Sequence, residues 1–328
     1  MNIFANCSAL SGVAISDTEC LVSLMNDGLS EARTQHSIPL VYKVGLWSFV
    51  SDEPILPWIT ADTARIGQNS QELLVVGWAG QVLLIDDAGT RREAIFRTDS
   101  LPVSIIRSAS AIGQVVYAAG MGRQVYRRTI ESGWTPIDGA VVSSNGESHV
   151  GFEAIGGFER GEIYAAGLNG ELWTYVGTAW HKIDSPANVH LHSICCAEDG
   201  FVYIGGRTGV LIKGREHSWQ VIDLGIDAPV WDMQWFNRTL YLIIDDGIYQ
   251  YSDGVAEKVA ASNAQGEFVN FSCSENRMWA FGRKKIAWFD GSGWSEHPAD
   301  ISEENLNRDL MSFLNDEVLI SGSPFLTE

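Results

Sequence analysis

Two histidines and two cysteines lie close together near the middle of the chain. His190 and His192 are separated by one residue, and Cys195 and Cys196 follow. On a β-strand, residues two apart share a face, so both imidazoles could reach one zinc ion. No other motif supplies the third and fourth ligands of such a site. We therefore expect no metal here, and we interpret the histidines as surface or hydrogen-bonded side chains.

Other residue pairs could in principle do chemistry. Asp86 and Asp87 are adjacent, as are Asp245 and Asp246. Paired carboxylates bind calcium or hydrolyse glycosides, but successive side chains in a hairpin turn seldom converge on one centre, so we interpret both pairs as turn formers. The Gly-Met-Gly sequence at 120–122 lacks the third glycine of a dinucleotide site, and nucleophile-elbow, phosphate-loop and zinc-protease motifs are absent. We expect no catalytic set and no cofactor.

The elements that carry these residues repeat with a period of about 40 residues. Tyr-Ala-Ala-Gly occurs at 117–120 and 164–167, and Tyr-Ile-Gly-Gly at 203–206, each followed by a second short apolar run and then a tryptophan. The runs have strand length, are rich in Val, Ile, Tyr and Trp, and are separated by glycine turns. This pattern predicts an all-β, single-domain, seven-bladed β-propeller. The seven equivalent positions are Gly77, Gly120, Gly167, Gly205, Ile243, Gly282 and Gly322.

The seventh unit is incomplete at its C-terminal end. Gly322 lies six residues before the last residue, which leaves no room for two outer strands. Residues 40–43 (LVYK) and 45–48 (GLWS) have the form of those strands. We therefore expect residues 1–60 to close the ring by pairing with the C-terminal blade, and residues 61–328 to form the blades. A separate cap or an eighth, degenerate blade at 1–60 stays open as an alternative.

Composition limits the partners. The net charge of −19 disfavours nucleic acid and anionic membranes, because phosphate groups would be repelled. The two ends of the chain, 1–64 and 286–328, hold 16 of the 41 acids but 3 of the 22 bases. Five cysteines without framework spacing indicate reduced thiols, and residues 1–12 lack the basic region of a secretory signal, so we expect a cytoplasmic protein.

A propeller usually binds its partners on one face, where two classes of loop meet. One class joins the second strand of a blade to the third, and the other joins the fourth strand to the next blade. We predict an acidic docking patch for a basic protein, with a tryptophan as anchor; a merely solvated acidic surface is the alternative. The first class contains Trp78, Met121, Arg123, Asn169, Arg207, Asp245, Asp246 and Arg283. The second class contains Asp52, Glu53, Asp300, Glu303, Glu304 and Asp309. The last four of these lie around a capping box that is expected to begin a short helix.

The blade pattern resembles a known group of propellers. Tyr-x-x-Gly-x-x-Gly-x-Leu followed by a tryptophan, at 164–180 and 203–219, is similar to bacterial propellers related to photosystem II assembly factors and to Asp-box sialidase-type repeats. The resemblance covers 70–328 at the level of the fold. The Asp-box itself is missing, since 216–219 and 291–294 keep only its ending, and no sialidase residues can be assigned.

The resemblance implies a protein whose task is to bind another protein. Among bacterial proteins of this kind we expect an immunity protein of a polymorphic or type VI-secreted toxin, which occludes a basic toxin domain such as a nuclease. Two other classes stay open. One is an assembly scaffold with several partners. The other is a glycan-binding protein or hydrolase that uses the channel mouth, with Asp245, Asp246, Arg207 and His190 as its polar groups.

Overall fold

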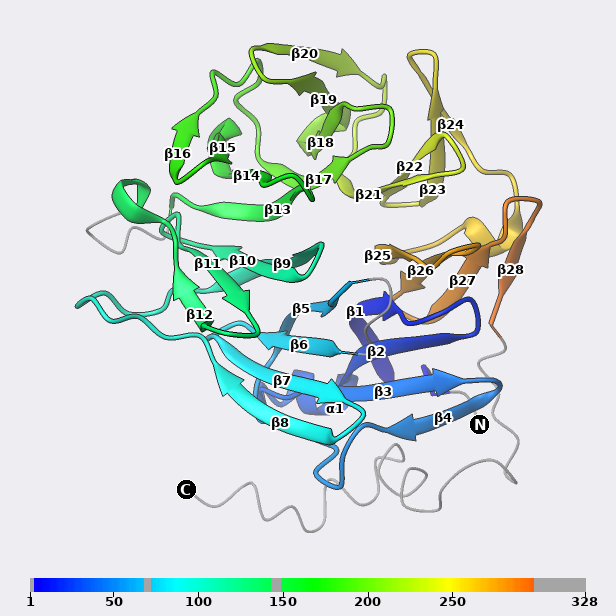
Figure 1. Cartoon of the computed structure of the whole chain (residues 1–328). Coiled ribbons are helices and arrows are strands. Elements are labelled where there is room, and N and C mark those ends of the chain that lie inside the picture. Colours follow the sequence, from blue (N-terminus) through cyan, green and yellow to red (C-terminus); the bar gives the residue numbers. More distant parts are fainter. Residues whose placement is uncertain (1–2, 68–71, 143–148, 298–328) are drawn as a thin grey trace.

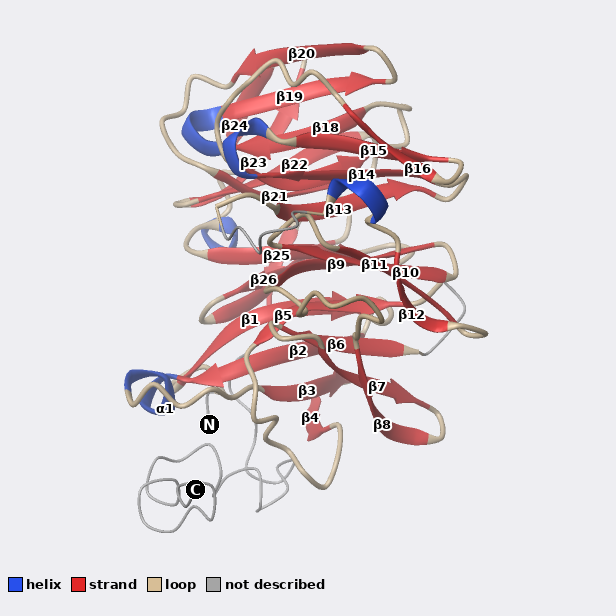
Figure 2. Cartoon of the chain, turned by 90° about the vertical axis from the view of Figure 1, so that its left-hand side faces the viewer, coloured by secondary structure: helices blue, strands red, loops and turns tan. Residues whose placement is uncertain are grey.

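Seven four-stranded antiparallel sheets form a ring in the computed structural model, which describes residues 3–67, 72–142 and 149–297. The sheets follow one another around the ring in chain order, and the first lies beside the last (Figure 1). Strands make up nearly all of the regular structure, and helical turns occur only in connections (Figure 2). The predicted all-β fold and the number of blades are confirmed.

Each blade is a simple meander in which neighbouring strands are consecutive in sequence. Blade 1 contains β1 (Cys7–Ala14), β2 (Glu19–Asn26), β3 (Ile38–Lys43) and β4 (Leu46–Phe49); blade 2, β5 (Thr60–Arg65), β6 (Leu73–Gly77), β7 (Gln81–Asp86) and β8 (Gly89–Ala94); blade 3, β9 (Ile106–Ile112), β10 (Val115–Gly120), β11 (Val125–Thr129) and β12 (Gly133–Pro136); blade 4, β13 (Phe152–Phe158), β14 (Glu162–Gly167), β15 (Leu172–Val176) and β16 (Ala179–Lys182). Blade 5 contains β17 (Leu191–Cys196), β18 (Val202–Gly206), β19 (Val210–Arg215) and β20 (Ser218–Asp223); blade 6, β21 (Val230–Phe236), β22 (Thr239–Ile244), β23 (Gly247–Ser252) and β24 (Val255–Lys258); blade 7, β25 (Phe268–Cys273), β26 (Met278–Gly282), β27 (Lys285–Phe289) and β28 (Trp294–Glu296). The connections contain α1 (Asp27–Glu31) and the short 3-10 turns η1 (Gly139–Val141), η2 (Leu168–Gly170), η3 (Arg207–Gly209) and η4 (Ser262–Ala264).

The repeated Tyr-Ala-Ala-Gly or Tyr-Ile-Gly-Gly motif forms the second strand of a blade. Its small residues are needed because this strand is closely packed. This strand is almost fully buried because a neighbouring blade covers each of its faces. At its end, a β-carbon on Gly120 would lie 2.0 Å from the carbonyl oxygen of Ile105, and one on Gly167 would lie 2.0 Å from that of Gly151. The chain entering the blade passes too close for any side chain, so glycine is required.

The predicted role of the N-terminal segment is wrong in its strand pairing. The strands expected at 40–43 and 45–48 are β3 and β4, but β3 pairs with β2, so residues 7–49 build a complete blade of their own. The alternative that residues 1–60 form a blade of their own agrees with this pairing, and counting units by their glycine missed the blade because β2 ends in Asn26. The position at Gly322 lies outside the described residues.

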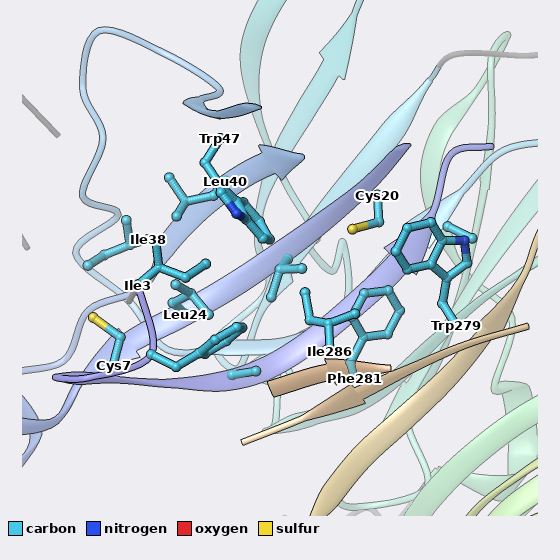
Figure 3. Packing of buried hydrophobic residues seen from close by; sticks show 14 residues of the cluster. Ile3, Cys7, Cys20, Leu24, Ile38, Leu40, Trp47, Trp279, Phe281 and Ile286 are labelled. Atoms are coloured by element: carbon cyan, nitrogen blue, oxygen red, sulfur yellow. The ribbon is translucent and has the colours of Figure 1, made fainter. Parts of the chain in front are cut away.

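The ring is closed by side chains at the seam between blades 1 and 7. Asn270 accepts a hydrogen bond from the Gly12 backbone N–H (3.0 Å) and donates one to the Gly12 carbonyl (2.7 Å). Trp279 donates its indole N–H to the carbonyl of Ser16 (3.1 Å). Trp279 and Phe281 of blade 7 pack into one buried cluster with side chains of blade 1, as Figure 3 shows. These contacts hold blades 1 and 7 together, and in the described residues each blade takes its four strands from one continuous segment of the chain.

Two further features bear on function. All five cysteines are free, and along β17 Cys195 is buried while Cys196 is partly exposed, as expected for successive residues on opposite faces. Among the described residues, no helix has the length and apolar character needed to span a membrane.

Candidate functional site

The two predicted classes of loop lie at the same end of the ring. In a meander, the chain reverses direction at each strand, so the connections after the second and fourth strands emerge together. Hydrogen bonds join them: Met121 N–H donates to Ile105 O (2.9 Å), and Arg207 N–H donates to His190 O (2.9 Å). We call this end of the ring the loop face. Partner binding by its residues stays a prediction.

Of the seven charged residues predicted for the loop face that the structure describes, four have an oppositely charged neighbour. Asp52 is exposed, and Asp245 accepts a hydrogen bond from the indole of Trp231 (2.6 Å). Arg123 donates hydrogen bonds from Nε to both carboxylate oxygens of Glu171 (2.8 and 2.9 Å). The described part of the face is thus a mosaic of both charges. The other pairs are Glu53 with Arg92 (2.6 Å), Arg283 with Glu267 (3.2 Å) and Asp246 with Lys258.

The uncharged predicted residues divide into structural and exposed ones. Met121 is 9% exposed, so it supports the face from beneath. Asn169 adopts φ 56° inside η2, and its backbone N–H reaches Nδ1 of His190 (3.4 Å). Arg207 begins η3. Asp300, Glu303, Glu304 and Asp309 lie outside the described residues.

Trp78 belongs to an exposed apolar cluster on blades 2 and 3, which we call the Trp78 cluster. It consists of Trp78 (39% exposed), Phe96 (56%) and Ile105 (47%). Their backbone segments lie side by side, since Ile106 N–H donates to Trp78 O (2.8 Å) and Ile95 N–H donates to Gly80 O (2.7 Å). Exposed aromatic and aliphatic groups on adjacent segments are typical of contact surfaces. Phe96 and Ile105 were not predicted, since each lies in a long connection without a repeat signal.

The centre of the loop face is the mouth of a channel. A cavity of about 310 Å³ is lined by the first strand of every blade. Each of these strands has a β-bulge near its start, where one residue has no partner on the second strand. We call these seven residues the bulge ring; they are Leu10, Ala61, Arg107, Glu153, His192, Trp231 and Val269.

Neighbouring members of the bulge ring contact each other. Arg107 pairs with Glu153 (2.7 Å), and the rings of His192 and Trp231 pack with centroids 4.8 Å apart. Burial, with a smaller effect of nearby positive groups such as Arg207, lowers the pKa of His192 to about 4, so the imidazole is neutral at neutral pH. His192 was considered as a metal ligand, but no group of three or more His, Cys, Asp or Glu side chains in the described ranges could hold an ion.

Two half-buried carboxyl groups, those of Asp62 and Asp232, line the channel. Burial raises the pKa of Asp62 to about 6 and that of Asp232 to about 7; hydrogen bonds oppose both shifts, and the charge of Asp62 adds to the second. Asp62 accepts the N–H of Ala109 (2.9 Å), and Asp232 accepts the N–H of Phe271 (2.7 Å). Each carboxyl therefore ties its blade to the next one.

Beside the mouth, between blades 6 and 7, a groove of about 490 Å³ opens on the loop face. Trp231 is 44% exposed and lines both the groove and the channel. The sequence showed this tryptophan only as an isolated Trp-Asp at the start of a unit. The signal available in the sequence was that Trp231 lies outside the position that tryptophan usually occupies in the repeat, where it packs between blades. The other lining residues are Asp245, Glu267, Phe268, Val269 and Arg283.

The residues suggested for a glycan enzyme do not act on one centre. Asp245 bonds to Trp231, whereas Asp246 pairs with Lys258 and accepts the hydroxyl of Tyr249 (3.0 Å). Two carboxylates that bond different neighbours lack the mutual placement that glycoside hydrolysis requires. Asp245 and Asp246 therefore do not form a carboxylate pair for glycoside hydrolysis.

Similar folds occur among solved structures. YCF48 from Cyanidioschyzon merolae is 13% identical, with a TM-score of 0.64 over 88% of this chain and 97% of that one. A structure of YCF48 bound to D1 peptide is 15% identical, with a TM-score of 0.63 over 88% and 93%. The WD40 propeller domain of Doa1 is 11% identical, with a TM-score of 0.65 over 90% and 95%. These likenesses show the fold alone, and the first two agree with the resemblance to photosystem II assembly factors.

One relative shares much more of the sequence. No family model matches the chain. The immune protein Tsi7 of Pseudomonas aeruginosa is 34% identical over 299 residues, which are 89% of this chain and 97% of the relative. Since this identity extends over nearly the whole of both chains, the protein belongs to the family of the immune protein Tsi7.

Proposed function

We propose that this protein protects its own cell by binding a protein toxin through the loop face and covering the toxin's working surface. Membership of the Tsi7 family carries the immunity role and a protein partner. An immune protein acts by binding, which agrees with a face that has exposed apolar groups and no converging catalytic residues. The proposal concerns the surface used and the nature of the partner.

The Trp78 cluster and Trp231 are the proposed anchors. They lie on different blades, 2–3 and 6–7, on either side of the channel mouth. Large aromatic groups that become fully desolvated dominate the affinity of protein interfaces, and the charged pairs around them form the rim. A partner that spans both anchors would cover the mouth of the channel.

We further propose that the partner is basic. The net charge of −19 attracts a cationic protein and speeds encounter. β28 ends at Glu296, on the loop face, so the segment with Asp300, Glu303, Glu304 and Asp309 follows from that end of the ring. We propose that these acids add to the attraction, that the toxin is delivered by a type VI secretion system, and that neutralisation occurs in the cytoplasm.

The test is affinity capture of a toxin from the native organism with this protein as bait, followed by substitution of the anchors. Trp78→Ala and Trp231→Ala are each expected to weaken binding by about 2 kcal/mol, roughly 30-fold, as for central interface aromatics. Ile130→Ala, in the β11–β12 hairpin at the opposite end of the ring, is the matched control and should bind like the wild type. Equal loss in all three variants, or no toxin binding at all, contradicts the proposal.

A further inference from the structure

The groove beside Trp231 is lined by aromatic, aliphatic and charged side chains. Trp231, Phe268 and Val269 are its apolar lining residues. Asp245 and Glu267 bring two carboxylates, and Arg283 brings one guanidinium. The charged groups of the groove therefore sum to one surplus negative charge next to an exposed indole.

The plane of the indole is fixed. Its N–H donates to Oδ1 of Asp245 (2.6 Å), and the ring of His192 packs against it at 4.8 Å between centroids. His192 lines the channel and not the groove, whereas Trp231 lines both. Trp231 therefore contacts His192 on the channel side and also contributes surface to the groove. A preset aromatic face next to carboxylates loses little conformational entropy when a ligand arrives.

The carboxylates are available to a ligand. Asp245 uses Oδ1 for the indole, which leaves Oδ2 as an acceptor. Glu267 and Arg283 form a largely exposed pair (Oε2 to Nε, 3.2 Å), and pairs of that kind hold their partners weakly. An incoming cation can replace Arg283 on Glu267 at small cost.

We propose that this groove binds one cationic side chain, an arginine or a lysine, of the protein partner. The ammonium or guanidinium would lie over the indole of Trp231, between the carboxylates of Asp245 and Glu267, with its aliphatic stem on Phe268 and Val269. An indole is the strongest aromatic partner for a cation, and opposite charge supplies the orientation. This inference rests on the proposed function, because it names the chemistry that the partner presents to the loop face.

The inference can be tested without the toxin. The probes are N-acetyl-arginine amide and N-acetyl-lysine amide, with N-acetyl-citrulline amide as a neutral analogue of nearly the same shape. The readout is the indole N–H resonance of Trp231 in the full chain, assigned by its loss in Trp231→Phe. We expect this resonance to move with at least one cationic probe and not with citrulline.

The carboxylates are tested by Glu267→Gln and Asp245→Asn, both close in volume to the wild type. Each is expected to weaken binding of the cationic probe about threefold, the size of one exposed charge contact. Glu131→Gln, in the β11–β12 hairpin at the opposite end of the ring, is the control and should leave the titration unchanged. Glu267→Gln is the decisive variant, because Glu267 has no hydrogen bond to Trp231.

An equal response to citrulline, or no response to either cation, overturns the inference even if the chain neutralises a toxin. If a cationic probe binds in this groove but no toxin is captured, the inference stands and the proposed function fails. The two proposals are therefore judged by separate measurements.

Discussion

Replacing Asp232 by asparagine should change how the stability of the ring depends on pH. Burial raises the pKa of the Asp232 carboxyl from 3.8 to about 7. The folded protein therefore holds this proton more tightly than the unfolded chain does. The stabilisation from the bound proton is complete below about pH 4 and is lost as the pH rises through about 7.

The size of the effect follows from the shift. One pKa unit corresponds to about 1.4 kcal/mol, so about three units give an upper limit of about 4 kcal/mol, and because the side chain borders the channel we expect about 2 to 4 kcal/mol. Asparagine has no proton to lose. The difference in unfolding free energy, Asp232→Asn minus wild type, should therefore rise by this amount between pH 4 and pH 8.

The structure already contains an asparagine in this role. Asn270 stands at the equivalent position of blade 7 and accepts the N–H of Gly12 as Asp232 accepts that of Phe271. The substitution therefore keeps the bond between blades. Asn270→Asp is the reciprocal variant: it should gain the pH dependence that Asp232→Asn loses, and it should be destabilised at pH 8 because its carboxylate would face the Gly12 carbonyl.

The assay is urea unfolding of the three proteins in parallel, followed by tryptophan fluorescence from pH 4 to pH 8. The pKa of His192 is lowered to about 4, so this residue destabilises the fold as the pH falls below about 6.5. It is present in every protein and cancels in the difference. A difference that stays within about 0.5 kcal/mol over the whole range would refute the reasoning, because the half-buried carboxyl would then titrate like an unfolded one.

Two further predictions concern the scaffold. Gly120→Ala should destabilise the fold by about 3 kcal/mol or more, because its β-carbon would lie 2.0 Å from the Ile105 carbonyl oxygen. Gly293→Ala is the control and should be near neutral, because there is open space around Gly293. Thermal unfolding measures both effects. Arg97→Met should lower the unfolding free energy by about 3 to 5 kcal/mol, because the side chains of Arg97 and Asp138 are both almost fully buried and Asp138 would lose its charged partner. The double variant Arg97→Met with Asp138→Asn should recover part of this loss in the same assay.

The architecture could be predicted from the sequence because packing between blades requires particular residue types at repeated positions. Gly120 and Gly167 end the second strand where the chain that enters the blade passes close by, and Trp134 is buried against blade 2, as packing between blades requires. Such features recur in several blades, so a period was visible. The repeat count missed blade 1 because its β2 ends in Asn26 and carries none of the repeated phrase.

The site was less predictable, because it depends on which side chains meet across the ring. The topology of a propeller was enough to place Trp78, Asp245 and Arg283 on the loop face. It could not show that Phe96 and Ile105 are exposed on segments adjacent to Trp78, or that Trp231 bonds to Asp245, since these segments have no fixed spacing in the sequence. Charge counting also overlooked local pairing, which ties Arg123 to Glu171.

The bulge in each first strand links recognition to stability. The bulged residue stands at the channel mouth, and the residue after it can reach the neighbouring blade. At four seams this following residue, Ser11, Asp62, Asp232 or Asn270, accepts a backbone N–H from the next blade. Trp231 and Asp232 are consecutive, so a proposed anchor for the partner is attached directly to a bond that holds blades 6 and 7 together. A substitution at one bulge can therefore affect binding through the seam, and binding loss in Trp231→Ala has to be compared with its unfolding free energy before it is assigned to a lost contact.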